Sequence, residues 1–121
     1  LSGDSVVPYA RFYRIAPANI LVAYDELDLA PGTVRFKLDG GHGGHNGLRD
    51  IMNKSGARDM KRLRIGIGHP GNSGQVSGYV LSKPSVDDRI AILGAIDRAV
   101  NTLPDILGGD FSRAMNTLHT D

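Results

Sequence analysis

The sequence predicts an α/β fold, a single domain with a mixed β-sheet flanked by helices in three layers. Three segments have strand patterns: a continuous apolar run at 20–24 and two alternations of apolar and polar residues at 34–38 and 62–68. A further segment, 86–107, repeats apolar residues at spacings of three and four, as an amphipathic helix does. Strand and helix patterns therefore alternate along the chain, which is typical of α/β domains.

Length and composition restrict the class of protein. The chain has 121 residues and no cysteine, enough for one compact domain, 1–121. The lack of cysteine excludes a disulfide scaffold, a thiolate metal site and a cysteine nucleophile. No window approaches the about 18 apolar residues that cross a bilayer, and the first residues do not resemble a signal peptide. We therefore expect a cytoplasmic protein with no membrane partner.

The charge is unevenly distributed, although the formal net charge is only +1. Residues 32–69 hold eight Lys or Arg against three Asp, a net charge of +5, whereas residues 1–31 and 86–121 are net acidic. A basic centre suits a phosphate-bearing partner, and solvated surface charge is the alternative explanation.

The first quarter of the chain predicts a helix and a strand. Residues 5–15 predict a short helix that Pro17 ends. The apolar face of this helix is expected to hold Val6, Tyr9, Ala10 and Tyr13. The run Ile20–Tyr24 predicts a strand covered on both faces, near the middle of the sheet. It places the acids of the segment 25–28 just past its end, where open α/β sheets put their sites, although a solvated turn explains them too.

Both alternating segments predict strands with one buried face. The residues expected to be buried are Val34, Phe36, Leu38, Leu63, Ile65 and Ile67. The residues expected on the opposite faces are the cations Arg35, Lys37, Arg62 and Arg64. Ordinary surface charge explains cations on an outward strand face, and binding to a phosphate group is the alternative.

The segment 39–47 reads DGGHGGHNG and predicts a loop whose backbone turns sharply or approaches a ligand closely. A helix is expected over 47–54, capped by Asn46 and ended by Gly56. The loop is neither a P-loop nor a complete GxGxxG, which disfavours a nucleotide fold. Metal binding by His42 and His45 is an alternative that lacks a third ligand.

The last third of the chain predicts two helices. A long helix is expected to begin after Ser85, with its apolar stripe packed on the sheet. The stripe consists of Val86, Ile90, Leu93, Ile96, Val100, Leu103 and Leu107. A short apolar turn is expected at Val76–Leu81 and a last helix at Phe111–Leu118.

Residues 41–51, GHGGHNGLRDI, resemble the GxxxHNG signature and its following residues in bacterial peptidyl-tRNA hydrolases. Four other segments match the same family in the same order. They are LSG at 1–3, DELDL at 25–29, RIGIGHPG at 64–71 and NTLH at 116–119. Asp39 departs mildly from the family, which more often has a small residue there. The resemblance covers the whole chain.

The family resemblance also implies that the chain is N-terminally truncated. Members of the family open with a strand and a TRHNxG segment that supplies the general-base histidine, and these 121 residues contain neither. The chain thus resembles the C-terminal two-thirds of the enzyme, and we expect it to be inactive alone.

The resemblance implies hydrolysis of the ester bond between peptide and tRNA, without a metal or other cofactor, by an enzyme that is monomeric at full length. Asp25 corresponds to the carboxylate that orients the general-base histidine. Asn46 corresponds to the residue that holds the substrate, and His45 lines the same cleft. The residues that correspond to contacts with tRNA phosphates are Arg35, Lys37 and Arg64.

Two alternatives remain beside the esterase. The chain could be a non-catalytic module that binds the tRNA acceptor end through its basic face and Asn46. It could also be a structural fragment that folds only with another segment or with a second copy.

Overall fold

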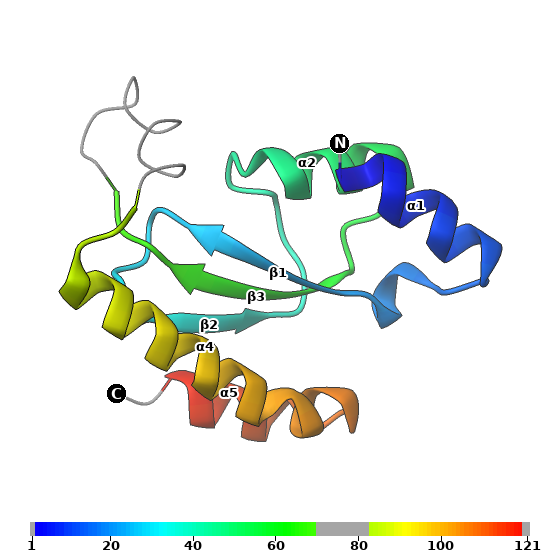
Figure 1. Cartoon of the computed structure of the whole chain (residues 1–121). Helices are drawn as coiled ribbons and strands as arrows, with labels where there is room; N and C mark the ends of the chain where they lie inside the picture. The colour runs from blue at the N-terminus through cyan, green and yellow to red at the C-terminus, as the bar shows by residue number, and fades with distance from the viewer. Residues whose placement is uncertain (1, 70–82, 120–121) are drawn as a thin grey trace. The chain divides into compact units, whose positions relative to one another are not determined.

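The computed structural model describes residues 2–69 and 83–119. Its elements, in chain order, are α1 (Ser2–Phe12), the 3-10 helix η1 (Pro17–Asn19), β1 (Leu21–Glu26), β2 (Val34–Lys37), α2 (Asn46–Ser55), β3 (Lys61–Gly66), α4 (Val86–Leu107) and α5 (Phe111–His119). Helices and strands are interspersed along the chain, although β1 is followed directly by β2 and α4 by α5 (Figure 1). The turn expected at Val76–Leu81 lies outside the described residues. None of the described helices is long and apolar enough to cross a membrane.

The described strands form one three-stranded sheet in the order β1-β3-β2. Strands β1 and β3 run in the same direction and β2 runs against them, so the sheet is mixed and the predicted fold class is confirmed (Figure 1). Among the described strands β3 lies in the middle and β1 at an edge, so the expected central position of Ile20–Tyr24 is not found in this sheet. Only Tyr24 and Glu26 of β1 are buried, so the continuous apolar run does not correspond to a strand covered on both faces.

The chain divides into two compact units, and all three strands contribute residues to both. The first comprises 1–24 and 37–63, and the second comprises 25–36 and 64–121. The expectation of one domain over 1–121 stays a prediction.

The first unit has an apolar core beneath α2. Its buried members are Tyr24, Leu48, Ile51, Met52 and Met60. Helix α1 packs against α2, and the Lys54 ammonium joins the two helices by contacting Asp4 Oδ1 at 2.6 Å and Asp50 Oδ1 at 2.9 Å. The pKa of both carboxyls lies below its usual value because each is hydrogen-bonded to Lys54. The buried face of α1 differs from expectation, since Gly3, Val7 and Ala10 are buried while Tyr9 and Tyr13 are exposed.

The second unit contains α4 and α5, which pack against each other. Helix α4 begins after Ser85 as expected, and the Ser85 hydroxyl accepts a hydrogen bond from Asp88 N–H at 3.1 Å. The expected inward stripe is wrong: six of its seven members, all except Leu103, are exposed by 36% to 80%. The buried residues of α4 are Ala95, Ala99, Thr102 and Ile106. Small side chains let this face approach its neighbours closely, because no bulky group separates the backbones.

Three expectations for the strands are also corrected. Leu38 is exposed because β2 ends at Lys37, one residue before it. Ile65 and Ile67 are only half-buried. Arg62, expected on an outward face, is fully buried, because main-chain carbonyl oxygens surround its guanidinium.

His119 makes the docking of α5 against β2 sensitive to pH. Its Nε2 accepts a hydrogen bond from Phe36 N–H at 3.0 Å, which requires an unprotonated nitrogen. Burial, and then the nearby charge of Arg35, hold the pKa of His119 below its usual value of 6.5. The unfolded chain therefore binds the proton first, so the stabilising contribution is complete above about pH 6.5 and is lost as the pH falls through the folded-state pKa.

We expect H119Q to unfold with a weaker dependence on pH than the wild type. The glutamine amide oxygen keeps an acceptor near Phe36 N–H but does not titrate in this range. Melting temperatures measured between about pH 7 and about pH 5 check this, since histidine titrates there. An equal fall in both proteins would contradict the assignment to His119.

Candidate functional site

The glycine loop before α2 is held in a tight turn by its own residues. Gly43 and Gly44 have φ of +58° and +82°, in the region that residues with a Cβ seldom adopt. His42 Nδ1 accepts a hydrogen bond from Gly44 N–H at 2.9 Å, and the His42 carbonyl accepts one from His45 N–H at 3.0 Å. The repeated glycines thus allow a turn that ends where α2 begins.

His45, not Asn46, caps α2. Its Nδ1 accepts a hydrogen bond from Leu48 N–H at 3.1 Å, so one of the unpaired amides of the first turn is satisfied. This hydrogen bond requires Nδ1 to be an acceptor and therefore unprotonated. The His45 ring also lies against Tyr24, with the ring centroids 4.9 Å apart. The predicted end of the helix is confirmed, since Gly56 follows α2 with φ of +70°.

Asn46 is the first residue of α2 and its side chain is exposed. Its Oδ1 accepts a hydrogen bond from Arg49 Nη2 at 2.8 Å. The Arg49 contact fixes which end of the amide carries the oxygen and directs the NH₂ group elsewhere. Asn46 is therefore an exposed, oriented hydrogen-bonding group next to His45, and its expected role in holding the substrate stays a prediction.

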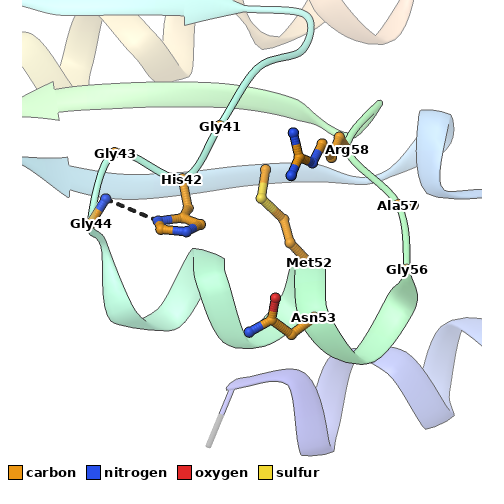
Figure 2. Close-up of a pocket in the computed structure, with 9 residues that line it drawn as sticks. All are labelled: Gly41, His42, Gly43, Gly44, Met52, Asn53, Gly56, Ala57 and Arg58. Carbon is orange, nitrogen blue, oxygen red and sulfur yellow. Dashed lines mark hydrogen bonds between the residues drawn. The ribbon is translucent and has the colours of Figure 1, made fainter.

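A pocket of about 510 Å³ opens between the glycine loop and the end of α2. Its lining residues are Gly41, His42, Gly43, Gly44, Met52, Asn53, Gly56, Ala57 and Arg58. Figure 2 shows the side chains of Met52 and Arg58 reaching into the same space between the loop and the helix. None of the six site residues predicted from the sequence lines this pocket.

Arg62 is a residue of this region that the sequence pattern missed. It donates to the Gly41 carbonyl at 2.6 Å, to the Gly40 carbonyl, and to the Arg58 carbonyl at 3.0 Å. Alternation in the strand placed it with the outward cations. Nothing in the strand pattern signals this role, because the accepting carbonyls of Gly41 and Gly40 lie 21 and 22 residues earlier in the chain.

The carboxyl end of β1 lies in the second unit. The strand extends through Glu26, so Asp25 and Glu26 belong to it and do not follow it. Asp25 is half-buried, and it projects on the face opposite to Glu26 because successive strand residues alternate.

Glu26 is buried and forms an ion pair with Arg64. Its Oε1 accepts from Arg64 Nε at 2.9 Å and from Arg64 Nη2 at 2.7 Å. Arg64 is thus held by a carboxylate on the protein, a contact that the sequence did not predict. Two other residues were expected to contact phosphates. Arg35 is half-buried and its Nη1 donates a hydrogen bond to the Val34 carbonyl at 3.2 Å, whereas Lys37 is exposed.

The part of the chain described here contains no grouping of three or more His, Asp or Glu side chains placed to hold a metal ion. His42 and His45 each use Nδ1 to accept a main-chain hydrogen bond. Their three-residue spacing is thus explained by the loop and the helix cap.

Comparison with known protein families identifies the chain's relatives. The family model described as "Peptidyl-tRNA hydrolase" matches residues 1–121, the full length of the chain. The chain belongs to the peptidyl-tRNA hydrolase family. The glycine loop, His45 and Asn46 are therefore at the position of the HNG signature from which this membership was expected.

Individual members of the peptidyl-tRNA hydrolase family match over almost all of this chain. A peptidyl-tRNA hydrolase of Coxiella burnetii (strain CbuG_Q212) is 53% identical over 119 residues, and one of Methylococcus capsulatus is 58% identical over 118. Each match covers 98% of this chain. The crystal structure of the Acinetobacter baumannii enzyme matches with a TM-score of 0.93 and 50% identity over 97% of this chain.

The chain spans 64% of the Coxiella burnetii relative and 63% of the Methylococcus capsulatus relative. It spans 59% of the Acinetobacter baumannii chain. The expected N-terminal truncation is not established by these coverages and stays a prediction.

Proposed function

We propose that the protein hydrolyses the ester bond between the peptide, or an N-blocked amino acid, and the tRNA in peptidyl-tRNA. The observation that supports this most is the family match over residues 1–121, with the HNG signature folded into a tight loop that presents an exposed Asn46 beside His45. The reaction needs a water activated near neutral pH and a site that positions the ester.

The proposed roles follow the chemistry of the side chains. The Asp25 carboxylate accepts a hydrogen bond from a general-base histidine, fixes its tautomer and stabilises the imidazolium that forms. Asn46 holds the substrate through its amide, and His45, whose Nδ1 accepts a hydrogen bond from Leu48 N–H, lines the same cleft. No step in this scheme requires a metal or organic cofactor.

The proposal is tested by release of an N-acetyl amino acid from charged tRNA. The family's TRHNxG segment, which supplies the base, has no counterpart in these 121 residues. We therefore define the extended protein, in which the part of the Coxiella burnetii relative ahead of its aligned residues is fused before Leu1. We expect turnover by the extended protein and none by the 121 residues alone, and an inactive, folded extended protein would overturn the proposal.

The second candidate function is a non-catalytic module that binds the acceptor end of tRNA. What favours it is the basic segment 32–69, which has a net charge of +5 and includes the exposed Lys37. Binding of tRNA without turnover in the extended protein would support this candidate over the esterase.

Contacts with tRNA phosphates are proposed for Arg35 and Lys37, and for Arg64 only together with its partner Glu26. Neutralising a phosphate releases counterions, so each such contact contributes about 0.7 to 0.9 to the slope of log affinity against log salt. We expect R35A/K37A to weaken tRNA binding and to reduce that slope by about 1.5. Titration of labelled tRNA at several salt concentrations measures it.

The control for this prediction is K83A/R89A, which removes two exposed cations from the start of α4 and the residues before it. It changes the net charge equally and is expected to leave the slope unchanged. Equal slopes in the two double variants would support ordinary surface charge at Arg35 and Lys37. Arg64 is left in place because its removal would leave the buried Glu26 carboxylate without its ion-pair partner.

The proposed substrate also determines the expected location. Peptidyl-tRNA is a product of translation, so we propose a cytoplasmic enzyme, and from the family resemblance we propose that it is a monomer at full length.

A further inference from the structure

The guanidinium of Arg62 is buried among main-chain carbonyl oxygens. Its side chain is 0% exposed, and its acceptors are the carbonyls of Gly40, Gly41 and Arg58. Its Nε has no hydrogen-bond partner among the described residues. An arginine remains charged at all physiological pH values, so this charge is stabilised by the carbonyl dipoles around it.

The three carbonyls belong to the two ends of one segment. Gly40 and Gly41 begin the glycine loop, whereas Arg58 lies just after α2. A single side chain on β3 therefore ties the start of the loop and the exit of the helix together. His45 and Asn46 lie between these two points in the sequence.

The backbone at the start of the loop is adapted to this contact. Gly40 has a φ of +120°, and a Cβ there would lie 2.9 Å from Lys37 Cε and 3.6 Å from Arg62 Nη1. The chain thus passes close to both side chains at a place where only glycine fits without strain. The planar fork of arginine can reach several carbonyls at once, which a lysine ammonium at the end of a flexible stem does less well.

We propose that Arg62 is a positioning residue: by holding the carbonyls of Gly40, Gly41 and Arg58, it determines where Asn46 and His45 are presented to the substrate. The identity of the substrate in this inference rests on the proposed function, whereas the hydrogen bonds from Arg62 to the three carbonyls are observed in the structure. Arg62 acts through the main chain of the loop and does not contact the substrate itself.

The test compares R62M and R62K with R89M in the extended protein. Methionine keeps much of the volume of Arg62 and removes every donor, lysine keeps the charge, and R89M makes the same substitution at an exposed site on α4. Two quantities are measured, the exchange rates of the loop amides at 40–46 and the kinetic constants for N-acetyl-aminoacyl-tRNA.

We expect R62M to speed exchange of the loop amides and to raise KM by about tenfold, because Asn46 and His45 would no longer be held where they bind the substrate, and losing one hydrogen bond to a ligand weakens binding by about that factor. A smaller change in kcat is expected, since Asp25 is not held by Arg62. R62K should fall between R62M and the wild type, and R89M should match the wild type. If R62M does not fold, the intermediate behaviour of R62K becomes the deciding observation.

Each other outcome counts against part of the proposal. Loop exchange unchanged in folded R62M would overturn the role of Arg62 in holding the loop. Faster exchange with an unchanged KM would overturn its role in positioning the substrate. An inactive wild-type extended protein would overturn the proposed function, and positioning for catalysis with it, while the exchange rates would still report whether Arg62 holds the loop.

Discussion

Replacing Asp25 by asparagine in the extended protein should lower kcat by about 10²-fold to 10⁴-fold, the range that general-base catalysis contributes. The amide has the shape of the carboxylate but cannot stabilise an imidazolium or fix the histidine tautomer in the same way. Asp25 is half-buried at the end of β1, so its removal leaves the apolar core intact. Release of N-acetyl amino acid from charged tRNA at saturating substrate measures the loss.

The matched control is D28N, three residues further on. Asp28 belongs to the same acidic segment and is exposed, and the substitution makes the same change of charge and shape. We expect D28N to retain wild-type kcat and both variants to show the circular dichroism of the folded protein. Wild-type kcat in D25N would remove Asp25 from the catalytic residues.

The α4 helix shows how far periodicity predicts a fold. Ser85 and the spacing of apolar residues predicted where the helix begins, because capping and helical repeat are local properties. The buried face was mispredicted, because the bulky stripe and the narrower stripe of Ala95, Ala99 and Thr102 have the same repeat. Which of them is buried depends on how closely neighbours such as α5 approach, and that distance is not encoded in the helix itself.

The candidate site likewise has local features that the sequence predicts and others that depend on the fold. The glycine loop could be predicted, since five of its nine residues are glycines and glycine tolerates positive φ. The cap was assigned one residue too late, because histidine and asparagine can both accept the first-turn amide. The burial of Arg62 could not be predicted, since its acceptors on Gly40 and Arg58 are brought to it by the fold.

Gly66 has the closest clash of the glycines compared among the described residues, so the smallest substitution there should damage the structure severely. It ends β3, and its N–H donates to the Thr33 carbonyl at 2.9 Å. A Cβ built on Gly66 would overlap the Ala30 carbonyl oxygen and lie 2.8 Å from the Leu29 carbonyl oxygen. Both oxygens belong to the main chain, so no side chain can rotate away to make room. The same turn is held by Gly68 N–H, which donates to the Leu29 carbonyl at 2.9 Å.

We therefore expect G66A to destabilise the protein by about 3 kcal/mol, the upper part of the range for overpacking, and to lower Tm by about 10 °C or more. The control is G94A, on α4, where the nearest atom to a new Cβ is Arg98 Nη1 at 3.9 Å. Alanine favours the helical conformation over glycine, so G94A should stabilise by up to about 1 kcal/mol. Thermal unfolding of both variants beside the wild type measures the two opposite shifts. An unchanged Tm in G66A would mean that the turn at Leu29 and Ala30 moves aside at little cost.

G66A should also disturb the nearby Glu26–Arg64 ion pair, because the new Cβ would force β3 and the turn at Leu29 and Ala30 apart.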